Sequence, residues 1–437
     1  MKVQKFGGTS VGSPQRIRDV ASLVSSFEGK NIIVVSAMSG TTNSLLEITS
    51  ALEKGDKAKA SELIDKLEAK YQDVVSELYV SSESKTKIQK IIDDIFSEIK
   101  ELAKSSYSSK IEKAIVGKGE ILSTNLLFHH MEEIGLKPAL VSALDFMKTD
   151  ENNEPDFPYI KSKLKEILSD LGDFDVIITQ GFICLNHQGE IDNLLRGGSD
   201  YTASIIGAAL KADEVDIWTD IDGMHNNDPR FVEETSPVHN LHFEEAAELA
   251  YFGAKILHPT CILPAKLHNI PVRLLNTMEP KAEGTLINNE LAQGSIKAVA
   301  AKDNITAIKI KSSRMLLAYG FLKKVFEVFE KYRTPIDMIA TSEVGVSLTI
   351  DDDTNLDSII SDLEKLGSVS LDRNMVIICV VGDLEWQNKG FEARALDALR
   401  NIPVRMISYG GSNYNISFLI DKANKTKALR LLSYHLF

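Results

Sequence analysis

The first 48 residues alternate between strand-like runs, glycine-containing turns and helix-like segments, and this rhythm limits the fold more than any other feature. A strand-like run from residue 2 meets a glycine pair and a helix, and NIIVVSAMSG at residues 31–40 is followed by another helix. A short, uniformly apolar run is typical of a strand that is buried on both faces. The same rhythm returns at residues 175–183, 215–223, 271–277 and 283–288. Strands alternating with helices predict an α/β fold with a mainly parallel sheet between helix layers.

One internal segment departs from this rhythm. Residues 56–116 contain neither glycine nor proline, and their apolar residues recur at helical spacing. We therefore predict at least two amphipathic helices inserted into the α/β unit. The total length of 437 residues favours two or three domains.

The C-terminal third contains an internal repeat. PIDMIATSEVGVSLTID begins at Pro335, and PVRMISYGGSNYNISFLID begins at Pro403. Each copy follows a helix-like stretch, which itself follows a strand-like run. Chance similarity of amphipathic elements would not reproduce this shared order, so we predict two similar small α+β domains.

Charge and cysteine content exclude several classes of protein. The net charge of −13 argues against a nucleic-acid or membrane-surface partner, because a phosphate backbone would be repelled. No apolar run reaches the roughly 18 residues of a membrane span, and the N-terminus lacks the layout of a signal peptide. The three cysteines, Cys184, Cys261 and Cys379, are far apart and match no disulfide or metal pattern. We therefore expect a cytoplasmic protein with reduced, mostly buried thiols.

The stretch KFGGTSVGS at residues 5–13 has the ingredients of a phosphate-binding loop in an unusual order. Lys5 precedes Gly7 and Gly8, whereas the lysine of a P-loop follows the glycines. Ser13 before Pro14 fits a helix N-cap followed by proline at the first helical position. Glycine N–H groups beside a helix N-terminus could hold a phosphate. A tight strand-to-helix turn with a surface lysine would explain the same residues.

Two further turns into helices carry polar side chains. In RGGSDYTA, Arg196 could hold a carboxylate or phosphate through two hydrogen bonds. The same motif also allows Ser199 or Asp200 to act as a helix cap. In GKGEILS, Glu120 lies in a first helical turn, where it could serve the helix dipole or a ligand ammonium.

A polar loop follows the strand expected at residues 215–223. TDIDGMHNNDPR at residues 219–230, with FGAKILHP at 252–259, supplies Asp220, Asp228, Arg230 and Lys255. Such mixed charge suits a nucleotide and its metal. Four histidines in this region match no zinc spacing, and we interpret them as ordinary loop or packing residues.

In this order the motifs resemble those of the aspartate kinase (aspartokinase) family of the amino acid kinase fold. The matching stretches are KFGGTSVG, VVSAMSGTTN, GKGEILS, TQGFI, RGGSDYTA, TDIDGMHNNDPR and FGAKILHP. The repeat resembles the paired ferredoxin-like ACT domains of that family. The resemblance implies a catalytic domain at residues 1–290, a first ACT domain at 304–372, and a second formed by 291–303 with 373–437. One departure is His225, where the family more often has a tyrosine beside the nucleotide.

The resemblance implies transfer of the ATP γ-phosphoryl group to the side-chain carboxylate of L-aspartate, the first step towards lysine, threonine and methionine. That carboxylate is already ionised at pH 7, so the reaction needs alignment and charge neutralisation rather than a general base. Mg²⁺ would be held mainly through ATP rather than by metal ligands of the chain. A homodimer or higher homo-oligomer, assembled through the ACT domains, is also implied.

The same resemblance assigns roles to individual residues. Lys5 would stabilise the transferring phosphoryl group, and Asp200 would organise Lys5. The expected phosphate cradle comprises Gly7, Gly8, Thr9, Ser39 and Gly40. The expected aspartate-binding residues are Thr42, Glu120, Arg196 and Ser199, and those for ATP are Thr219, Asp220, Arg230 and Lys255.

The ACT pair implies feedback inhibition by an end-product amino acid. GFLKKVF and IDMIATSEVGV resemble the effector site of lysine-sensitive members. By this resemblance Asp337 would meet the effector ammonium, and Ser342 and Glu343 would complete the site. Lysine is the first expectation and threonine the second. Asp337 could also be an ordinary loop residue between a helix and a strand.

Two other functions compete with this interpretation. Another kinase of the same fold could act on glutamate, acetylglutamate, carbamate or UMP, but it would not require the ACT pair or KFGGTS together with RGGSDYTA. A catalytically dead amino-acid sensor would use only its ACT domains. The presence of Lys5, Arg196 and Asp200 argues against the sensor.

Overall fold

The computed structural model describes residues 1–194, 197–253, 257–312 and 319–437. The chain forms two compact units: Met1–Met224 with Leu257–Asn289, and His225–Ile256 with Glu290–Phe437. Among the described residues, no helix combines the length and apolarity that a membrane crossing requires.

The first unit is built on a mainly parallel sheet. Its strands are β1 (Lys2–Phe6), β2 (Asn31–Val35), β3 (Pro138–Leu140), β4 (Val176–Gln180), β7 (Glu214–Thr219), β9 (Val272–Asn276) and β10 (Thr285–Asn288). They lie in the order β3-β4-β2-β1-β7-β9-β10, and every neighbouring pair is parallel except β9 with β10. A small hairpin of β5 (Ile183–Leu185) and β6 (Ile191–Asn193) lies outside this sheet. The predicted parallel sheet is confirmed.

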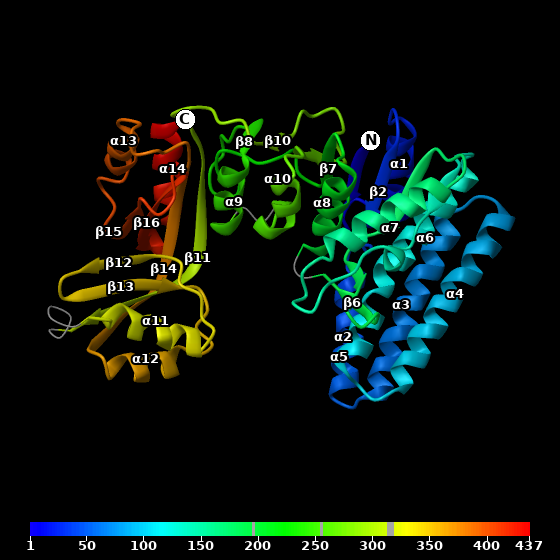
Figure 1. The fold of residues 1–437 in the computed structure, drawn as a ribbon, viewed down its shortest axis with the longest axis horizontal. Helices are drawn as coiled ribbons and strands as arrows, with labels where there is room; N and C mark the ends of the chain where they lie inside the picture. The colour runs from blue at the N-terminus through cyan, green and yellow to red at the C-terminus, as the bar shows by residue number, and fades with distance from the viewer. Residues whose placement is uncertain (195–196, 254–256, 313–318) are drawn as a thin grey trace. The chain divides into compact units, whose positions relative to one another are not determined.

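Helices cover both faces of this sheet (Figure 1). They are α1 (Pro14–Ser25), α2 (Thr41–Glu53), α6 (Lys118–Glu133), α7 (Phe157–Asp170), α8 (Gly198–Leu210) and α10 (Leu263–Leu267), with short 3₁₀ turns at Ala143–Asp145 and Pro259–Ile262. Successive strand residues face opposite ways, so β2 shows which helices lie on which side. Ile33 shares a core with Val20 of α1 and Leu122 of α6, whereas Ile32 lines the same small cavity as Ile206 of α8.

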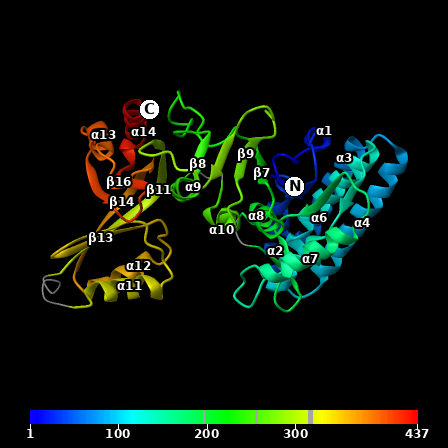
Figure 2. The ribbon, with the colours of Figure 1, turned by 45° about the horizontal axis from the view of Figure 1, so that its top comes forward.

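A helical layer extends the α1–α6 side. It consists of α3 (Lys57–Leu78), α4 (Ser82–Lys104) and α5 (Ser109–Val116), and α3 and α4 lie side by side in Figures 1 and 2. The side chains of Asp56, Ser81 and Ser108 cap the three N-termini. The amphipathic helices predicted between residues 56 and 116 are therefore confirmed.

The second unit contains an antiparallel sheet shared by two similar halves. Its strands are β11 (Ile296–Lys311), β12 (Ile339–Ser342), β13 (Gly345–Ile350), β14 (Ser368–Gly382), β15 (Val404–Tyr409) and β16 (Asn415–Asp421), in the order β12-β13-β11-β14-β16-β15. Its C-terminal helices are α11 (Phe321–Lys331), α12 (Leu356–Glu364), α13 (Phe391–Ala398) and α14 (Lys425–Leu436), with a 3₁₀ turn at Lys422–Asn424. One apolar core includes α11 and α12, and another includes α13 and α14. The predicted repeat is confirmed.

Two long strands join these halves. β11 and β14 pair with each other along most of their length, and their register shifts near Ile305. Asn304 and Asn374 adopt positive φ angles of 62° and 57° beside this shift. Asparagine tolerates this conformation better than most residues. The register shift and the two left-handed residues together form a break within each strand, and this break separates the two cores.

Residues 225–256 belong to the second unit rather than to the parallel sheet's unit. They include β8 (Asn240–His242) and α9 (Phe243–Tyr251). Val232 lies in the core of α13 and α14, and the Asn227 side chain donates to the Leu429 carbonyl at 3.1 Å. The polar loop at residues 219–230 is therefore divided between two units.

Candidate active site

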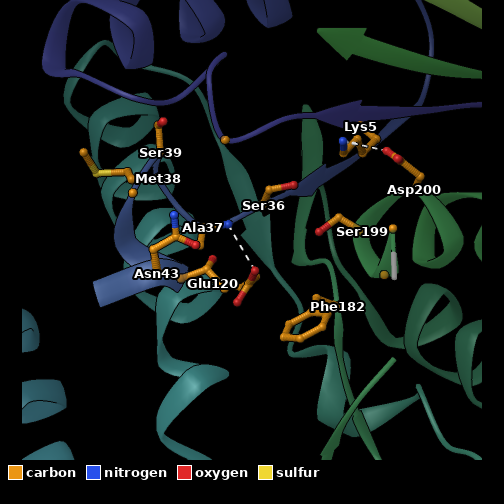
Figure 3. Close-up of a pocket in the computed structure, with 15 residues that line it drawn as sticks. Lys5, Ser36, Ala37, Met38, Ser39, Asn43, Glu120, Phe182, Ser199 and Asp200 are labelled. Atoms are coloured by element: carbon orange, nitrogen blue, oxygen red, sulfur yellow. Dashed lines mark hydrogen bonds and ion pairs between the residues drawn. The ribbon is translucent and has the colours of Figure 1, made fainter. Parts of the chain in front are cut away.

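A cavity of about 370 Å³ lies beyond the carboxyl ends of the first unit's strands (Figure 3). Lys5 on β1, the loop after β2 and the turn after β4 all contribute to its lining. Parallel strands end at the same edge of a sheet, so their following loops meet there. The sheet topology thus gathers into one place motifs that are distant in the sequence.

The first two glycine-containing loops are held together tightly. A Cβ atom on Gly8 would lie 2.7 Å from the carbonyl oxygen of Ala37, so only glycine fits at this position. The Ser39 N–H donates to the Gly8 carbonyl at 3.0 Å. Ser13 caps α1 and accepts a hydrogen bond from the Arg16 N–H, as the sequence predicted. Both loops therefore present backbone to the same cavity.

Lys5 faces the cavity from β1 and is paired with Asp200 of α8. Their Nζ and Oδ1 atoms are 2.6 Å apart, and the side chains are 11% and 14% exposed. Figure 3 shows this pair at the wall of the cavity. A partly buried ammonium held by a single carboxylate has N–H donors left for an anion. The pair can thus position a cation beside an incoming phosphoryl group.

The start of α8 excludes one of the two interpretations that RGGSDYTA allowed. The helix begins at Gly198 with Gly197 as its N-cap and has no side-chain cap bond, so neither Ser199 nor Asp200 is the cap. Both lie in the first turn and line the cavity. A Cβ on Gly181 would lie 2.4 Å from the Ser199 Oγ, so this glycine lets the turn after β4 approach Ser199 closely. Ser199 is thus placed at the cavity for a ligand, whereas Asp200 is engaged by Lys5.

Glu120 lies in the first turn of α6 and is 4% exposed. Its Oε1 accepts a hydrogen bond from the Ala37 N–H at 3.2 Å, whereas Oε2 is buried and has no hydrogen-bond partner among the described residues. Burial raises the pKa of this carboxyl group to about 8. A buried carboxyl oxygen without a donor is costly unless a ligand supplies one. An ammonium group would supply both the donor and the compensating charge.

Sequence reasoning gave no role to several residues that line the cavity. They are Ser36, Ala37, Met38, Asn43, Phe182, Gly197 and Gly198. Phe182 has a φ of 67°, which is unusual for an aromatic residue and costs about 1–3 kcal/mol. Its N–H donates to the Thr202 hydroxyl at 3.0 Å, and its carbonyl accepts from the Leu194 N–H at 2.7 Å. TQGFI was recognised as a motif, but the strain at its phenylalanine has no signal in the sequence.

The structure gathers many of the predicted site residues. Those that line the cavity are Lys5, Gly8, Ser39, Gly40, Thr42, Glu120, Ser199 and Asp200. Gly7 and Thr9 belong to the same loop without lining the cavity, and the Gly7 N–H donates to the Trp218 carbonyl at 3.1 Å. Arg196 and Lys255 lie outside the described residues.

The residues predicted to bind ATP are spread over both units. Thr219 and Asp220 follow Trp218 at the end of β7, and the Thr219 hydroxyl donates to the Asp220 carboxylate at 3.1 Å. Arg230 belongs to the second unit, where its guanidinium pairs with Asp228 at 2.6 Å. His225, also in that unit, forms a hydrogen bond with Thr235 at 2.8 Å.

The predicted effector residues lie around β12 in the second unit. Asp337 precedes the strand and has a fully buried side chain. Ser342 ends the strand, and Glu343 is exposed in the following turn. The structure thus places Asp337 and the other two residues at opposite ends of β12.

Comparisons with protein families agree with this architecture. A model of the amino acid kinase family matches residues 1–276, and an ACT-domain model matches residues 378–436.

The three cysteines, Cys184, Cys261 and Cys379, are buried and form no disulfide.

Full-length relatives carry related names. Chloroplastic aspartokinase 1 of Arabidopsis thaliana is 34% identical, and the match covers 100% of this chain and 80% of that protein. Lysine-sensitive aspartokinase 3 of Escherichia coli (strain K12) is 32% identical, with 100% and 99% covered.

Solved structures also resemble the whole chain. Aspartokinase III of E. coli in complex with aspartate and ADP (R-state) has a TM-score of 0.84 at 32% identity, with both chains fully covered. The same enzyme in complex with lysine and aspartate (T-state) gives the same values. Aspartate kinase of Clostridium acetobutylicum has a TM-score of 0.88 at 26% identity, again with full coverage of both chains.

Proposed function

Because the chain belongs to the amino acid kinase family, among its aspartokinases, we propose that it transfers the ATP γ-phosphoryl group to the side-chain carboxylate of L-aspartate. The product would be the acyl phosphate 4-phospho-L-aspartate. One observation carries this proposal: the Lys5–Asp200 pair faces the same cavity as Glu120, whose buried Oε2 atom has no hydrogen-bond partner in the part of the chain that the structure describes. An acidic amino acid needs both an ammonium acceptor and a cation for its reacting end.

Aspartate would bind with its ammonium group at Glu120 and its side chain towards Lys5. Ser199 and Thr42 line the cavity and would orient the carboxylates, together with Arg196. Lys5 would neutralise charge on the transferring phosphoryl group, while Asp200 holds the ammonium in place. This is catalysis by positioning and electrostatic stabilisation, and it requires no proton abstraction.

ATP would occupy the side of the cavity formed by the first two loops. N–H groups of Gly8, Thr9 and Gly40 would cradle its phosphates. The predicted contributions of Gly7 and Ser39 cannot come from their N–H groups, which donate to the Trp218 and Gly8 carbonyls at 3.1 and 3.0 Å. Thr219, Asp220, Arg230 and Lys255 would contact the nucleotide. Within the described ranges no group of three or more His, Cys, Asp or Glu side chains is arranged to hold a metal. Mg²⁺, which often binds through phosphates and water, would be held mainly by ATP and would neutralise part of its charge.

We further propose feedback regulation through the second unit. The catalytic domain would span residues 1–290, the first ACT domain 304–372, and the second 291–303 with 373–437. Aspartokinase III of E. coli has been solved with lysine, which supports lysine as the first candidate effector. Threonine is the second candidate. The effector would meet Asp337, Ser342 and Glu343, and ACT domains would join copies of the chain into a homodimer or larger assembly. In this role the enzyme would begin lysine and threonine biosynthesis.

The substrate can be tested with the purified full-length chain. Release of ADP is followed with L-aspartate or L-glutamate, and hydroxylamine traps the acyl phosphate as a hydroxamate. We expect turnover with aspartate, and greater turnover with glutamate would refute the assignment.

The role of Lys5 is tested by Lys5→Met, which keeps the length of the side chain. We expect a loss of about 10²-fold or more in kcat, the scale seen when a group that stabilises transition-state charge is removed. Lys2→Met is a matched control, because Lys2 lies on the same strand and is paired with Glu214 at 2.8 Å. Near-normal turnover of Lys5→Met would remove Lys5 from the mechanism.

A further inference from the structure

A buried charged cluster in the second unit surrounds Asp337. The Asp337 Oδ1 atom accepts hydrogen bonds from Lys302 Nζ at 2.6 Å and from the Tyr251 hydroxyl at 2.8 Å. The Asp337 side chain is 0% exposed, and its Oδ2 atom has no hydrogen-bond partner among the described residues. The carboxylate predicted to meet an effector is thus already in contact with an ammonium group of the chain itself.

Lys302 has a second acidic partner. Its Nζ atom lies 2.9 Å from Asp351, whose side chain is 34% exposed. Two carboxylates share one ammonium, so the three groups together carry one uncompensated negative charge. One more cation would therefore make the cluster electrically neutral.

Tyr251 connects this cluster to α9. Tyr251 is the last residue of that helix, and Lys302 Nζ also lies 4.3 Å from the centre of its ring. A cation over an aromatic ring stabilises by about 0.5–2 kcal/mol. Lys302 thus fixes Tyr251 in two ways, through the ring and through the shared Asp337 oxygen.

We propose that this cluster binds the ammonium group of an amino-acid effector in exchange for Lys302, and that the exchange loosens the contacts that fix Tyr251. Lys302 then moves wholly onto Asp351, and the effector ammonium takes its place at Asp337. Two ammonium groups on one buried carboxylate would repel each other, so exchange is favoured over simple addition. The inference rests on the regulation proposed above and adds the residues through which the effector acts.

Release of Tyr251 would affect the polypeptide that follows α9. Lys255, proposed to contact ATP, comes four residues after Tyr251 in the sequence. A ligand can shift an equilibrium only by binding two states unequally, and the Lys302 exchange supplies such a difference.

The experiment measures effector binding to full-length protein by calorimetry, with L-lysine and L-threonine as probes. Lys302→Met removes the internal competitor, so we expect the effector Kd to fall about tenfold, as for one charged hydrogen bond. Asp351→Asn removes the alternative partner of Lys302 and the surplus negative charge, so the Kd should rise about threefold or more, a smaller change because this side chain is partly exposed. If the two residues only stabilised the fold, the two substitutions would not be expected to change the effector Kd in opposite directions.

A similar cluster nearby provides matched controls. Lys331 pairs with Asp362 at 2.7 Å, the Tyr332 hydroxyl donates to Asp362 at 2.9 Å, and Lys331 lies 4.7 Å from the Tyr332 ring. Lys365 also pairs with this carboxylate, so the control cluster has no surplus negative charge. Lys331→Met should leave both the effector Kd and the basal activity unchanged.

The coupling step is tested by Tyr251→Phe, which keeps the ring and removes the hydroxyl. We expect this variant to bind effector while showing weaker maximal inhibition, and undiminished inhibition would refute the role of Tyr251. Unchanged or same-direction Kd shifts in Lys302→Met and Asp351→Asn would refute the exchange. If the wild-type protein phosphorylates aspartate but binds neither probe, the ammonium site is refuted while the proposed reaction stands. Absence of aspartate phosphorylation would instead refute the proposed function.

Discussion

The raised pKa of Glu120 predicts a pH-dependent affinity for aspartate. The free carboxyl group has a pKa of about 8 because it is buried, whereas the bound form should be ionised opposite the substrate ammonium. At pH 7 only about one tenth of the free enzyme is ionised at Glu120, which costs about 1.4 kcal/mol of binding energy. We therefore expect kcat/KM for aspartate to rise about tenfold per pH unit below pH 8 and then to level off.

The same shift predicts how the stability of the free enzyme depends on pH. The folded-state pKa of Glu120 is raised above its ordinary value of 4.5, so folding favours the protonated form. The stability this provides is present below pH 4.5 and is lost as pH rises through about 8, to a total of about 5 kcal/mol at most. Aspartate should restore part of this loss above pH 8 by supplying the missing partner.

The assay for the Glu120 prediction is kcat/KM for aspartate between pH 6.5 and 8.5 at saturating ATP, with the KM for ATP as an internal control. Glu120→Gln keeps the shape and removes the ionisation, so this variant should bind aspartate weakly and lose the rise with pH. Calorimetry in buffers of different ionisation enthalpy should show release of about 0.9 proton per aspartate bound at pH 7. A flat wild-type profile, or the same rise in Glu120→Gln, would refute the reasoning.

Two further substitutions test the shape of the cavity. Gly181→Ala places a Cβ atom 2.4 Å from the Ser199 Oγ and 2.8 Å from the Ser199 Cα, so both kcat/KM for aspartate and the temperature of thermal unfolding should fall; unchanged kinetics would contradict the packing. Phe182→Asn relieves the strain of a φ of 67° but removes a half-buried ring that packs against the apolar core of the first unit, so the free energy of unfolding should fall by about 1 kcal/mol and kcat/KM should fall too. A urea titration and steady-state kinetics on the same preparation measure both effects, and a stabilised variant would show that the strain matters more to folding than the ring does.

Local patterns in the sequence predicted most of the fold. The apolar run at residues 31–35 predicted a strand buried on both faces, and every residue of β2 is buried. Ser13 with Pro14 predicted the start of α1, because a cap depends on residues within one helical turn. The repeat at Pro335 and Pro403 predicted two similar halves, since matching order is visible without a structure.

Features that depend on distant contacts could not be predicted in this way. The alternative interpretation of Ser199 or Asp200 as the cap of α8 is wrong, because Gly197 is the N-cap. The link between Lys5 and Asp200, which pair between β1 and α8, came from the family resemblance and not from a local pattern. Phenylalanine gives no local signal for the left-handed backbone of Phe182. The contact of Lys302 in β11 with Asp337, which precedes β12, joins residues 35 positions apart and has no periodic pattern.

The division of residues 219–230 between the two units has a consequence for regulation. Asp220 belongs to the unit of the parallel sheet, and Arg230 belongs to the other, where neighbouring Val232 lies in an apolar core. At both of its ends the segment 225–256 is joined through the backbone to the unit that contains Lys5 and Glu120, at Met224 and at Leu257. A ligand that shifts the position of α9 acts on this segment directly, because Tyr251 lies within it. Inhibition would then need no separate signalling element, since the segment proposed to contact the nucleotide through Arg230 is itself packed into the second unit.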